Sequence, residues 1–419
     1  MNFKIYLILA TVKPFKAVRA TRDKVALVSS RSYDAYSPAE LGSQLDFNPY
    51  SFLHIISPSY NSRQEISTAE RFEAIKSKYN EFKDKHTYIK EEIPVFYIYQ
   101  KITDKSDFIG IIAATSNIDY ENNIIKKHEK TLKKREILFK NYLKATGFNA
   151  EPVLLTYPDN EKINSVIKKY KNQRAEYEFT TRNKKTHLLW IVDNLDDIKL
   201  IQNEFSKIKS LYIADGHHRS ASSYLLAKDL EKDNPNHTGN EDYNFCLSYL
   251  ISESNLQISE FNRLVKNLNG ISKVDFLQKL EKRFIITKLS DTTYKPTKTH
   301  QFSLYIDDEV YLLEFQSKKK DYKTALHQLD TYILYKHILK KILDIKDLRR
   351  DKRIAYANCK KGQNYLKEQV LNGNYRVAFG LFPISVEEMK AVANECLKMP
   401  PKSTYILPKL RSGLIIYEF

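Results

Sequence analysis

Apolar runs and helical repeats alternate along most of this chain. Apolar residues fill the short runs 53–56, 95–99, 109–114 and 153–157, and runs of this length predict buried strands. Between the first two lies the stretch 68–83, whose apolar residues recur at helical spacing and predict one long helix. This alternation predicts an α/β fold of mixed α+β type.

Two further helices are marked by the residues at their starts. Ser37, Pro38 and Glu40 combine an N-cap, a proline at the first helical position and the carboxylate of a capping box. Ser385 and Glu388 repeat the box. Local chemistry therefore predicts helices that begin just after residues 37 and 385.

The rest of the chain continues the alternation. The polar stretch 160–185 predicts an exposed helix and a connector, and 229–243 predicts a surface loop. Strands are predicted at 187–192, 302–306 and 376–382, and helices at 274–283 and 327–342. We therefore expect an N-terminal α/β region (1–160), a central region (161–270) and a smaller C-terminal α+β subdomain (271–419) whose tail returns to the site.

The most distinctive chemistry follows the apolar run at 211–213. Asp215, Gly216, His217, His218 and Arg219 stand directly before a helical repeat, which predicts a strand-to-helix turn. The N–H groups of a helix start attract anions, glycine allows close backbone approach, and arginine binds phosphate oxygens in pairs. We expect a phosphorylated ligand here, with Mg²⁺ held by the aspartate.

A second polar cluster contains His128, Glu129, Lys130 and Thr131, with Arg135 shortly after. Its imidazole, carboxylate and cations lie within about two helical turns. Glu129 can therefore act as a general base, and the other four side chains can contact a nucleotide. The alternative is a solvated helix turn in which the carboxylate pairs with neighbouring cations.

Tyr33 and Asp34 lie in a loop just before a predicted helix. A carboxylate in such a loop can reach a bound substrate, so both residues are candidates for substrate contacts. The alternative is that Asp34 only caps the local backbone.

A donor-rich loop near the C-terminus contains Lys402, Ser403 and Thr404, preceded by two prolines. Lys409 and Arg411 follow it. Lysine and hydroxyl side chains donate hydrogen bonds, so this loop can complete a phosphate site. An ordinary turn is the alternative.

A protein-bound transition metal is a further possibility for His128, Glu129, His217 and His218. Adjacent histidines point in different directions on a helix, and the sequence has neither an HExxH helix nor paired cysteines. Mg²⁺ brought by a nucleotide and held by Asp215 is favoured instead. The chain also lacks a Walker loop, a kinase-type glycine loop, a GxSxG elbow and a dinucleotide fingerprint, which disfavours the common nucleotide folds.

Length and charge limit the expected number of domains and the kind of partner. A chain of 419 residues exceeds what one core usually organises, so about two to three domains are expected. The 68 Lys and Arg residues outnumber 51 Asp and Glu residues and give a formal charge of +17, which attracts polyanions and phosphorylated metabolites. The basic residues occur in short, interrupted clusters typical of solvated helix faces, so nucleic acid is not the expected partner.

Cysteine usage and the first residues indicate the compartment. Cys246, Cys359 and Cys396 are odd in number and far apart, which excludes a disulfide framework and fits the cytoplasm. The apolar run 6–12 is too short to span a membrane, so it predicts a first strand and no membrane partner is expected.

These motifs, in this order, resemble a known family. The chain resembles prokaryotic proteins of roughly 400 residues defined by an Ala-Asp-Gly-His-His-Arg motif, a domain of unknown function whose core box is similar to that of ParB-type proteins and free-serine kinases. The matching residues are 14–15, 19, 33–34, 48–54, 97, 99–100, 128–132, 134–136, 145–147, 214–219, 263–265, 351–353, 399–405 and 408–409. In one departure, Asn262 precedes Arg263 where relatives usually have histidine.

The resemblance implies a core like that of ParB and the serine kinases, with ATP or ADP and Mg²⁺ as cofactors. In the free-serine kinases that this box resembles, the turn holds nucleotide phosphates and a separate carboxylate deprotonates serine. Residues 215–219 match the turn one by one, whereas Glu129 is chosen as the base on chemical grounds, with Asp34 second. The implied function is interconversion of serine and O-phosphoserine. The alternatives are a ParB-like, nucleotide-binding, DNA-associated protein without turnover and a phosphoserine phosphatase.

Overall fold

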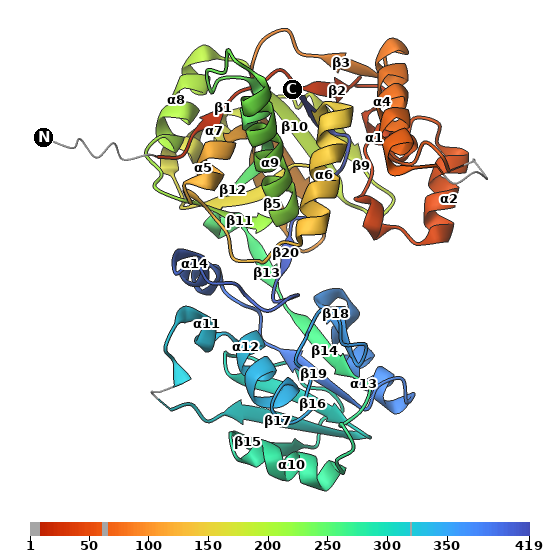
Figure 1. Ribbon diagram of the computed structural model, residues 1–419, viewed down its shortest axis with the longest axis vertical. Coiled ribbons are helices and arrows are strands. Elements are labelled where there is room, and N and C mark those ends of the chain that lie inside the picture. The colour runs from red at the N-terminus through yellow and green to blue at the C-terminus, as the bar shows by residue number, and fades with distance from the viewer. Residues whose placement is uncertain (1–8, 61–65, 319–320) are drawn as a thin grey trace, which may run out of the picture. The chain divides into compact units, whose positions relative to one another are not determined.

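The computed structural model describes residues 9–60, 66–318 and 321–419. They form two compact units (Figure 1). The first unit takes the described residues up to Lys126, Thr131–Leu256 and Pro408–Phe419, and the second takes Lys127–Lys130 and Gln257–Leu407. The chain therefore leaves the first unit after Leu256 and returns to it for its last residues.

The first unit is built on a mixed sheet whose described strands follow the order β6-β11-β8-β12-β5-β4-β10-β9, with β1 also beside β5. The pairs β6–β11 and β8–β12 are parallel, and the other pairs are antiparallel. The strands are β1 (Val12–Lys13), β4 (Phe96–Ile102), β5 (Asp107–Ser116), β6 (Ile125–Lys126), β8 (Val153–Tyr157), β9 (Tyr177–Thr180), β10 (Thr186–Val192), β11 (Leu211–Asp215) and β12 (Phe245–Ser252). The α/β fold expected from the alternation is confirmed.

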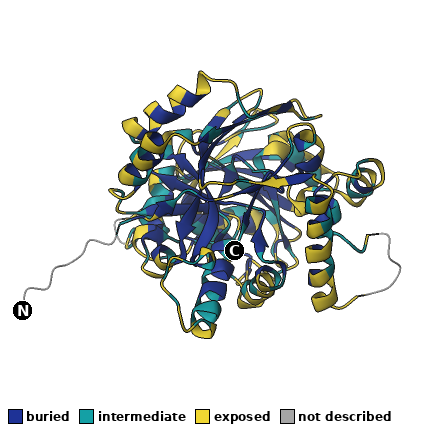
Figure 2. Ribbon diagram, turned by 90° about the horizontal axis from the view of Figure 1, so that it is seen from above, coloured by how far each residue is buried: buried dark blue, intermediate teal, exposed yellow. Residues whose placement is uncertain are grey.

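Helices cover this sheet because the middle strands are apolar on both faces. Figure 2 shows the strands largely buried and the outer helix faces exposed. The helices are α1 (Val25–Val28), α2 (Pro38–Phe47), α3 (Leu53–Ile56), α4 (Thr68–Asp84), α5 (Asn117–Glu121), α6 (Lys133–Thr146), α7 (Glu161–Lys171), α8 (Leu195–Phe205) and α9 (His217–Asp233). A small sheet, β3-β2-β21-β7, ties the C-terminal tail to the N-terminal region. Its strands are β2 (Val18–Ala20), β3 (Tyr88–Lys90), β7 (Phe148–Asn149) and β21 (Ile415–Glu418).

The second unit contains an antiparallel sheet with the order β15-β17-β16-β19-β14-β18, together with a ribbon formed by β13 and β20. The strands are β13 (Gln257–Ser259), β14 (Phe261–Val265), β15 (Phe284–Leu289), β16 (Gln301–Ile306), β17 (Glu309–Phe315), β18 (Ile354–Asn358), β19 (Val377–Leu381) and β20 (Tyr405–Leu407). The helices are α10 (Lys273–Glu281), α11 (Ala325–Gln328), α12 (Asp330–Leu334), α13 (Gly362–Leu371) and α14 (Val386–Asn394).

Most predicted elements are confirmed. The strands expected at 95–99, 109–114, 153–157, 187–192, 302–306 and 376–382 and the helices expected at 68–83 and 274–283 are present. Both capping boxes form, because the Ser37 and Ser385 side chains each accept the backbone N–H three residues later. Residues 6–8 of the predicted first strand lie outside the described residues.

Three predictions of local structure are wrong. Residues 53–56 form helix α3 rather than a strand, since so short an apolar run does not distinguish the two. The helix expected at 327–342 is divided into α11, α12 and a π-helical turn at Tyr335–Leu339. The connector within 160–185 contains β9, whose alternating buried and exposed residues pair with β10.

The division into units differs from the three regions expected from the sequence. Strands from 1–160 and from 161–270 are hydrogen-bonded in one sheet, since β8 pairs with both β11 and β12. Residues 408–419 belong to the first unit. Among the described residues, no helix is both long and apolar enough to cross a membrane.

Candidate functional site

The motif at 215–219 lies on the turn from β11 to α9, as predicted. Gly216 makes this turn with a φ of 102°, a backbone conformation that residues with a side chain rarely adopt. A Cβ at this position would also lie 3.2 Å from the guanidinium of Arg219. Both constraints require glycine at the point where the strand becomes a helix.

The first N–H groups of α9 lie at the N-terminal end of the helix, next to Gly216. Gly216 has no side chain to cap them, and the first bond within the helix runs from the Ser220 N–H to the Gly216 carbonyl. The N–H groups of a first turn have no carbonyl one turn earlier and carry partial positive charge. This end of α9 therefore favours a negatively charged ligand.

Asp215 stands between two cations. Its Oδ2 lies 3.2 Å from Nη2 of Arg219, and its Oδ1 lies 3.5 Å from Nζ of Lys409. Burial alone would raise the pKa of Asp215, but Lys409, Arg219 and His217 outweigh burial and lower the pKa below 3.8. The carboxylate is therefore ionised at neutral pH while its side chain stays 41% exposed.

Arg219 connects the turn to the beginning of β8. Its Nη1 donates to the Pro152 carbonyl at 2.5 Å and lies 3.8 Å from Oε2 of Glu151. The Arg219 side chain, which is 26% exposed, is thus fixed by Asp215 at the end of β11 and by the segment just before β8. An arginine oriented in this way needs little further ordering to bind a phosphate.

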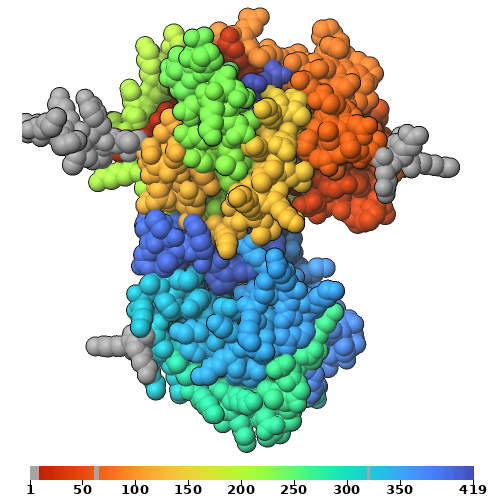
Figure 3. Space-filling view, in the orientation of Figure 1, coloured from red at the N-terminus to blue at the C-terminus, as the bar shows by residue number. Residues whose placement is uncertain are grey.

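His218 joins the turn to α6. Its Nε2 accepts the Leu132 backbone N–H at 3.0 Å, which places Leu132 and the adjacent Thr131 beside the turn. Lys140 and Asp229 also form an ion pair at 2.5 Å between α6 and α9, and the two helices lie side by side on the surface of the first unit (Figure 3). The start of α6, which also carries Arg135, therefore borders the turn.

His128, Glu129 and Lys130 belong to the second unit. The His128 carbonyl accepts the Met399 N–H at 2.8 Å, and the Lys130 carbonyl accepts from Nη2 of Arg349 at 2.8 Å. The second unit thus fixes the backbone of this segment through contacts far away in the sequence.

The loop with Lys402, Ser403 and Thr404 also belongs to the second unit. Ser403 is buried, and its Oγ lies 2.7 Å from the Pro400 carbonyl and 3.1 Å from Oγ1 of Thr331. Thr404 is buried as well, whereas Lys402 is exposed with its ammonium 5.4 Å from the Phe261 ring centre. The Ser403 hydroxyl thus holds the loop together.

Tyr33 and Asp34 form an exposed 3₁₀ turn in the first unit. The chain just before this turn is held by the C-terminal tail, because Ser30 and Ser412 exchange two backbone hydrogen bonds. The short tail segment 409–412 therefore contacts Asp215 through Lys409 and the chain just before the Tyr33 turn through Ser412.

Several polar residues near the turn were missed from the sequence. Lys101 on β4 donates to the Lys409 carbonyl, and Tyr99 lies 2.7 Å from Nδ1 of His187 on β10. Lys101 and His187 are direct partners across β4 and β10. A signal was present in each case, since Lys101 and His187 are polar residues within otherwise apolar strands.

Asn262, the departure from the usual histidine, has a structural contact. It is buried in β14, and its Oδ1 accepts the Leu381 N–H of β19 at 3.0 Å. Asn262 therefore extends the β14–β19 pairing.

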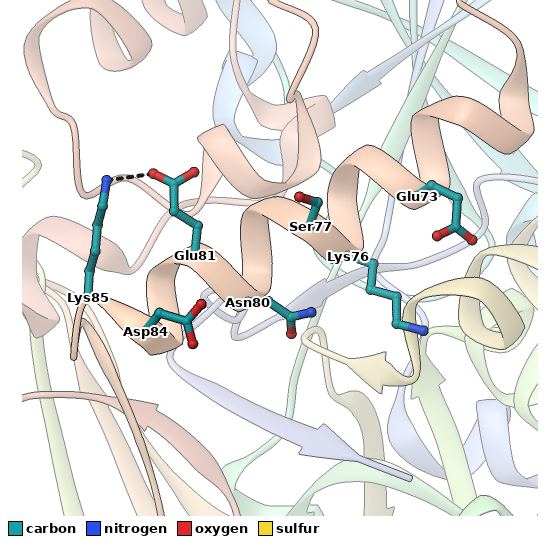
Figure 4. A pocket seen from close by; sticks show the side chains of 7 residues that line it. All are labelled: Glu73, Lys76, Ser77, Asn80, Glu81, Asp84 and Lys85. Atoms are coloured by element: carbon teal, nitrogen blue, oxygen red, sulfur yellow. Dashed lines mark hydrogen bonds and ion pairs between the residues drawn. The ribbon is translucent and has the colours of Figure 1, made fainter.

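A shallow hollow along α4 does not have the character of a site (Figure 4). It is lined by residues of one exposed helix face and its end, and two of its charges, Lys85 and Glu81, pair with each other at 2.6 Å. No second element contributes to its described lining.

The fold and the turn define a general class: a mixed α/β protein whose larger unit presents a charged strand-to-helix turn. Residues 12–332 match the family described as "Protein of unknown function (DUF1015)". The match covers well over half of the chain, so the chain belongs to this family. The family membership expected from the motifs is confirmed.

Solved structures with a similar arrangement have low sequence identity. A free serine kinase in complex with AMP is 13% identical with a TM-score of 0.36, over 69% of this chain and 86% of that chain. SbnI from Staphylococcus aureus with a C-terminal truncation is 13% identical with a TM-score of 0.37, over 72% and 84% of the two chains. A conserved hypothetical protein from Pyrococcus furiosus is 14% identical with a TM-score of 0.33, over 68% and 88%. No curated protein matches this chain in sequence.

Proposed function

We propose that this protein is a nucleotide- and Mg²⁺-dependent phosphotransferase that interconverts serine and O-phosphoserine. The observation that carries the proposal is the ionised Asp215 between Arg219 and Lys409 at the start of α9. A carboxylate for Mg²⁺ and several cations for phosphates are the groups that phosphoryl transfer requires. The similarity of this box to that of the free-serine kinases supplies the choice of serine.

The turn supplies the phosphate-binding groups. In the proposal, the first N–H groups of α9, together with His217, His218 and Arg219, neutralise the charge of the transferring phosphoryl group. Gly216 lets the phosphate approach the backbone. Lys402 and Thr404, like His128, Lys130, Thr131 and Arg135, are proposed as additional nucleotide contacts.

Asp215 fits a role in holding Mg²⁺. Its carboxylate is ionised, partly exposed and free of backbone capping duties, and Mg²⁺ is usually bound through one or two carboxylates plus substrate phosphates and water. Such an ion, when bound, neutralises charge on the transferred group.

Glu129 is proposed as the base that takes the proton from the serine hydroxyl. In the sequence it lies three positions before Leu132, whose N–H donates to His218. Asp34 is the second choice, with Tyr33 beside it as a substrate contact. The Glu129→Gln variant is expected to lose turnover while it keeps affinity for ADP, because only proton transfer is removed.

The proposal is tested by mass spectrometry of purified protein with Mg²⁺, given serine with ATP or O-phosphoserine with ADP. We expect interconversion in the wild type and none in Asp215→Asn. Asp229→Asn is a matched control, because it removes a carboxylate of the same helix that pairs with Lys140 away from the turn.

Other outcomes identify the other functions. Phosphate release from O-phosphoserine without nucleotide would replace the phosphotransferase with a phosphatase. Absence of any conversion, together with DNA affinity that falls steeply with salt, would favour the ParB-like alternative.

A further inference from the structure

Two cations and two carboxylates of the first unit meet around the β11–α9 turn. Asp215 lies 3.2 Å from Arg219 and 3.5 Å from Lys409, and Arg219 also lies 3.8 Å from Glu151. The two positive and two negative charges of these side chains cancel. A phosphate that arrives without a metal ion therefore meets no net positive charge among these four groups, since each cation already has a carboxylate beside it.

Arg219 is the cation whose position is fixed. Its Nη1 donates to the Pro152 carbonyl at 2.5 Å, and its side chain is only 26% exposed. A guanidinium carries five N–H donors, so a phosphate can be added to the contacts that it already makes. Arg219 can therefore bind a ligand and keep its contact with Asp215.

Lys409 has a fixed backbone and a more accessible side chain. Its carbonyl accepts a hydrogen bond from Lys101, and Ser412, three residues later, exchanges two backbone hydrogen bonds with Ser30. The side chain is 44% exposed, and a lysine ammonium is a compact charge on a flexible four-carbon stem. The tail therefore holds Lys409 beside the turn, while the ammonium can exchange one anionic partner for another.

The two oxygens of Asp215 face different cations. Oδ2 faces Arg219, and Oδ1 faces the Lys409 ammonium. A divalent cation bound at Oδ1 would repel that ammonium, because both are positively charged. Mg²⁺ is usually bound by carboxylates together with substrate phosphates, so the same event that displaces the ammonium brings it a new anion.

We infer that Lys409 is a phosphate ligand that changes partner: Asp215 holds its ammonium in the empty protein, and a nucleotide phosphate takes the ammonium over when a divalent cation occupies Asp215. The inference rests on the proposed function. It adds Lys409 to the phosphate-binding groups and makes the binding of metal and nucleotide cooperative, because each ligand removes the internal partner with which the other competes. Nucleotide without a divalent cation should bind the protein poorly.

Calorimetry with ADP, in EDTA or in Mg²⁺, tests this exchange without turnover. Wild type should bind ADP at least about tenfold more tightly with Mg²⁺ than in EDTA. In Asp215→Asn the affinity in EDTA should rise at least about threefold above wild type, because the cations lose their internal competitor, and Mg²⁺ should add less than about twofold. Asp229→Asn, which removes a carboxylate of the same helix paired with Lys140, should behave as wild type.

A double variant shows whether the gain passes through Lys409. When Asp215→Asn is combined with Lys409→Gln, the increase in metal-free affinity should disappear, since no ammonium is left to bind the phosphate. Lys409→Gln alone should lower the affinity for ADP with Mg²⁺ at least about fivefold. Lys144→Gln, which removes an exposed lysine that faces Asp233 of α9, should leave both affinities unchanged.

Each contrary result has a separate meaning. Equal wild-type affinities for ADP with and without Mg²⁺, or no gain in Asp215→Asn, would overturn the exchange, and the serine assay then decides the proposed function by itself. A gain that persists in the double variant would overturn the role of Lys409 and assign the phosphate to Arg219 and the helix end. Cooperative binding without conversion of serine would overturn the proposed function alone. If ADP binds under neither condition, both proposals fail.

Discussion

Asp215 in the first unit is partly exposed and Asp330 in the second unit is buried, and the charges of the two carboxyl groups differ as well. Lys409, Arg219 and His217 outweigh the effect of burial and lower the pKa of Asp215. Burial raises the pKa of Asp330 to about 8, although its Oδ1 accepts the His300 N–H at 2.8 Å. The protonation state of a carboxylate is therefore set by the cations around it, and of these two aspartates only Asp215 is ionised at neutral pH, as the proposed Mg²⁺ role requires.

The two loops whose composition suggests phosphate binding, the β11–α9 turn and the loop at 402–404, differ in how their polar side chains are used. The β11–α9 turn leaves its carboxylate and guanidinium partly exposed. In the loop after Pro401, Ser403 directs its hydroxyl at its own backbone. The charged groups of the turn are thus accessible to a ligand, whereas the Ser403 hydroxyl is used within its own loop.

The largest expected effect comes from exchanging each aspartate for asparagine. Asp215→Asn should lower kcat/KM for phosphoryl transfer at least about 1,000-fold, because a charged ligand of Mg²⁺ is lost. Asp330→Asn should leave kcat/KM within about threefold, since asparagine resembles the protonated acid. Steady-state kinetics of both variants check this, and equal losses would remove the distinction between the two aspartates.

Gly216→Ala should lower both stability and activity. The alanine meets a φ of 102° and the Arg219 guanidinium, so we expect a loss of about 1–3 kcal/mol in unfolding free energy and at least about a tenfold loss of activity. Gly239→Ala is the matched control, because φ is 86° there and no atom lies within 4 Å of the added Cβ. Urea unfolding measures the cost of backbone strain, and initial rates measure the effect of displacing Arg219. An unchanged rate in Gly216→Ala would show that the arginine position is unimportant.

Ser403→Ala should affect the fold rather than the reaction. The lost contacts to Pro400 and Thr331 should lower the unfolding free energy by about 1 kcal/mol. Activity per folded molecule should change less than about threefold. A large loss of activity without a change in stability would instead assign Ser403 to the ligand. Ser165→Ala, at an exposed hydroxyl, provides the baseline.

The smallest effect is the pH dependence of stability contributed by Asp330. Its folded pKa of about 8 lies above the ordinary value of 3.8, so the native state holds an extra proton between these values. Stability contributed by this group is therefore greatest below pH 4 and falls as pH rises to about 8. The difference in urea midpoint between wild type and Asp330→Asn should change across this range. A constant difference would show that Asp330 is ionised.

Much of the fold was predictable because its signals are local. The strands around the turn are continuous apolar runs, and the turn itself is contiguous in sequence, with glycine at the one position that needs a left-handed conformation. The capping boxes are likewise local, since the residues that make them are three positions apart. Short or mixed segments such as α3 and β9 were mispredicted, because tertiary packing decides their conformation.

The surroundings of the turn were only partly predictable. Lys409 and Arg411 were noticed, but their neighbours Lys101 and His187 were not, because the four meet only through β4–β10 pairing and the return of the tail. Likewise, sequence composition does not reveal that the Ser403 hydroxyl donates a hydrogen bond to the Pro400 carbonyl. Contacts between residues distant in sequence are fixed by topology, which one-dimensional patterns do not contain.

The most direct test of the central claim follows the phosphoryl group itself. Purified protein is given Mg²⁺, serine and ATP that carries ¹⁸O in its γ-phosphate, beside the Asp215→Asn variant. The account predicts O-phosphoserine that carries three ¹⁸O atoms with the wild type and none with the variant. Label found only in inorganic phosphate, or equal labelling of serine by the variant, would contradict the assignment of the β11–α9 turn as the site of phosphoryl transfer.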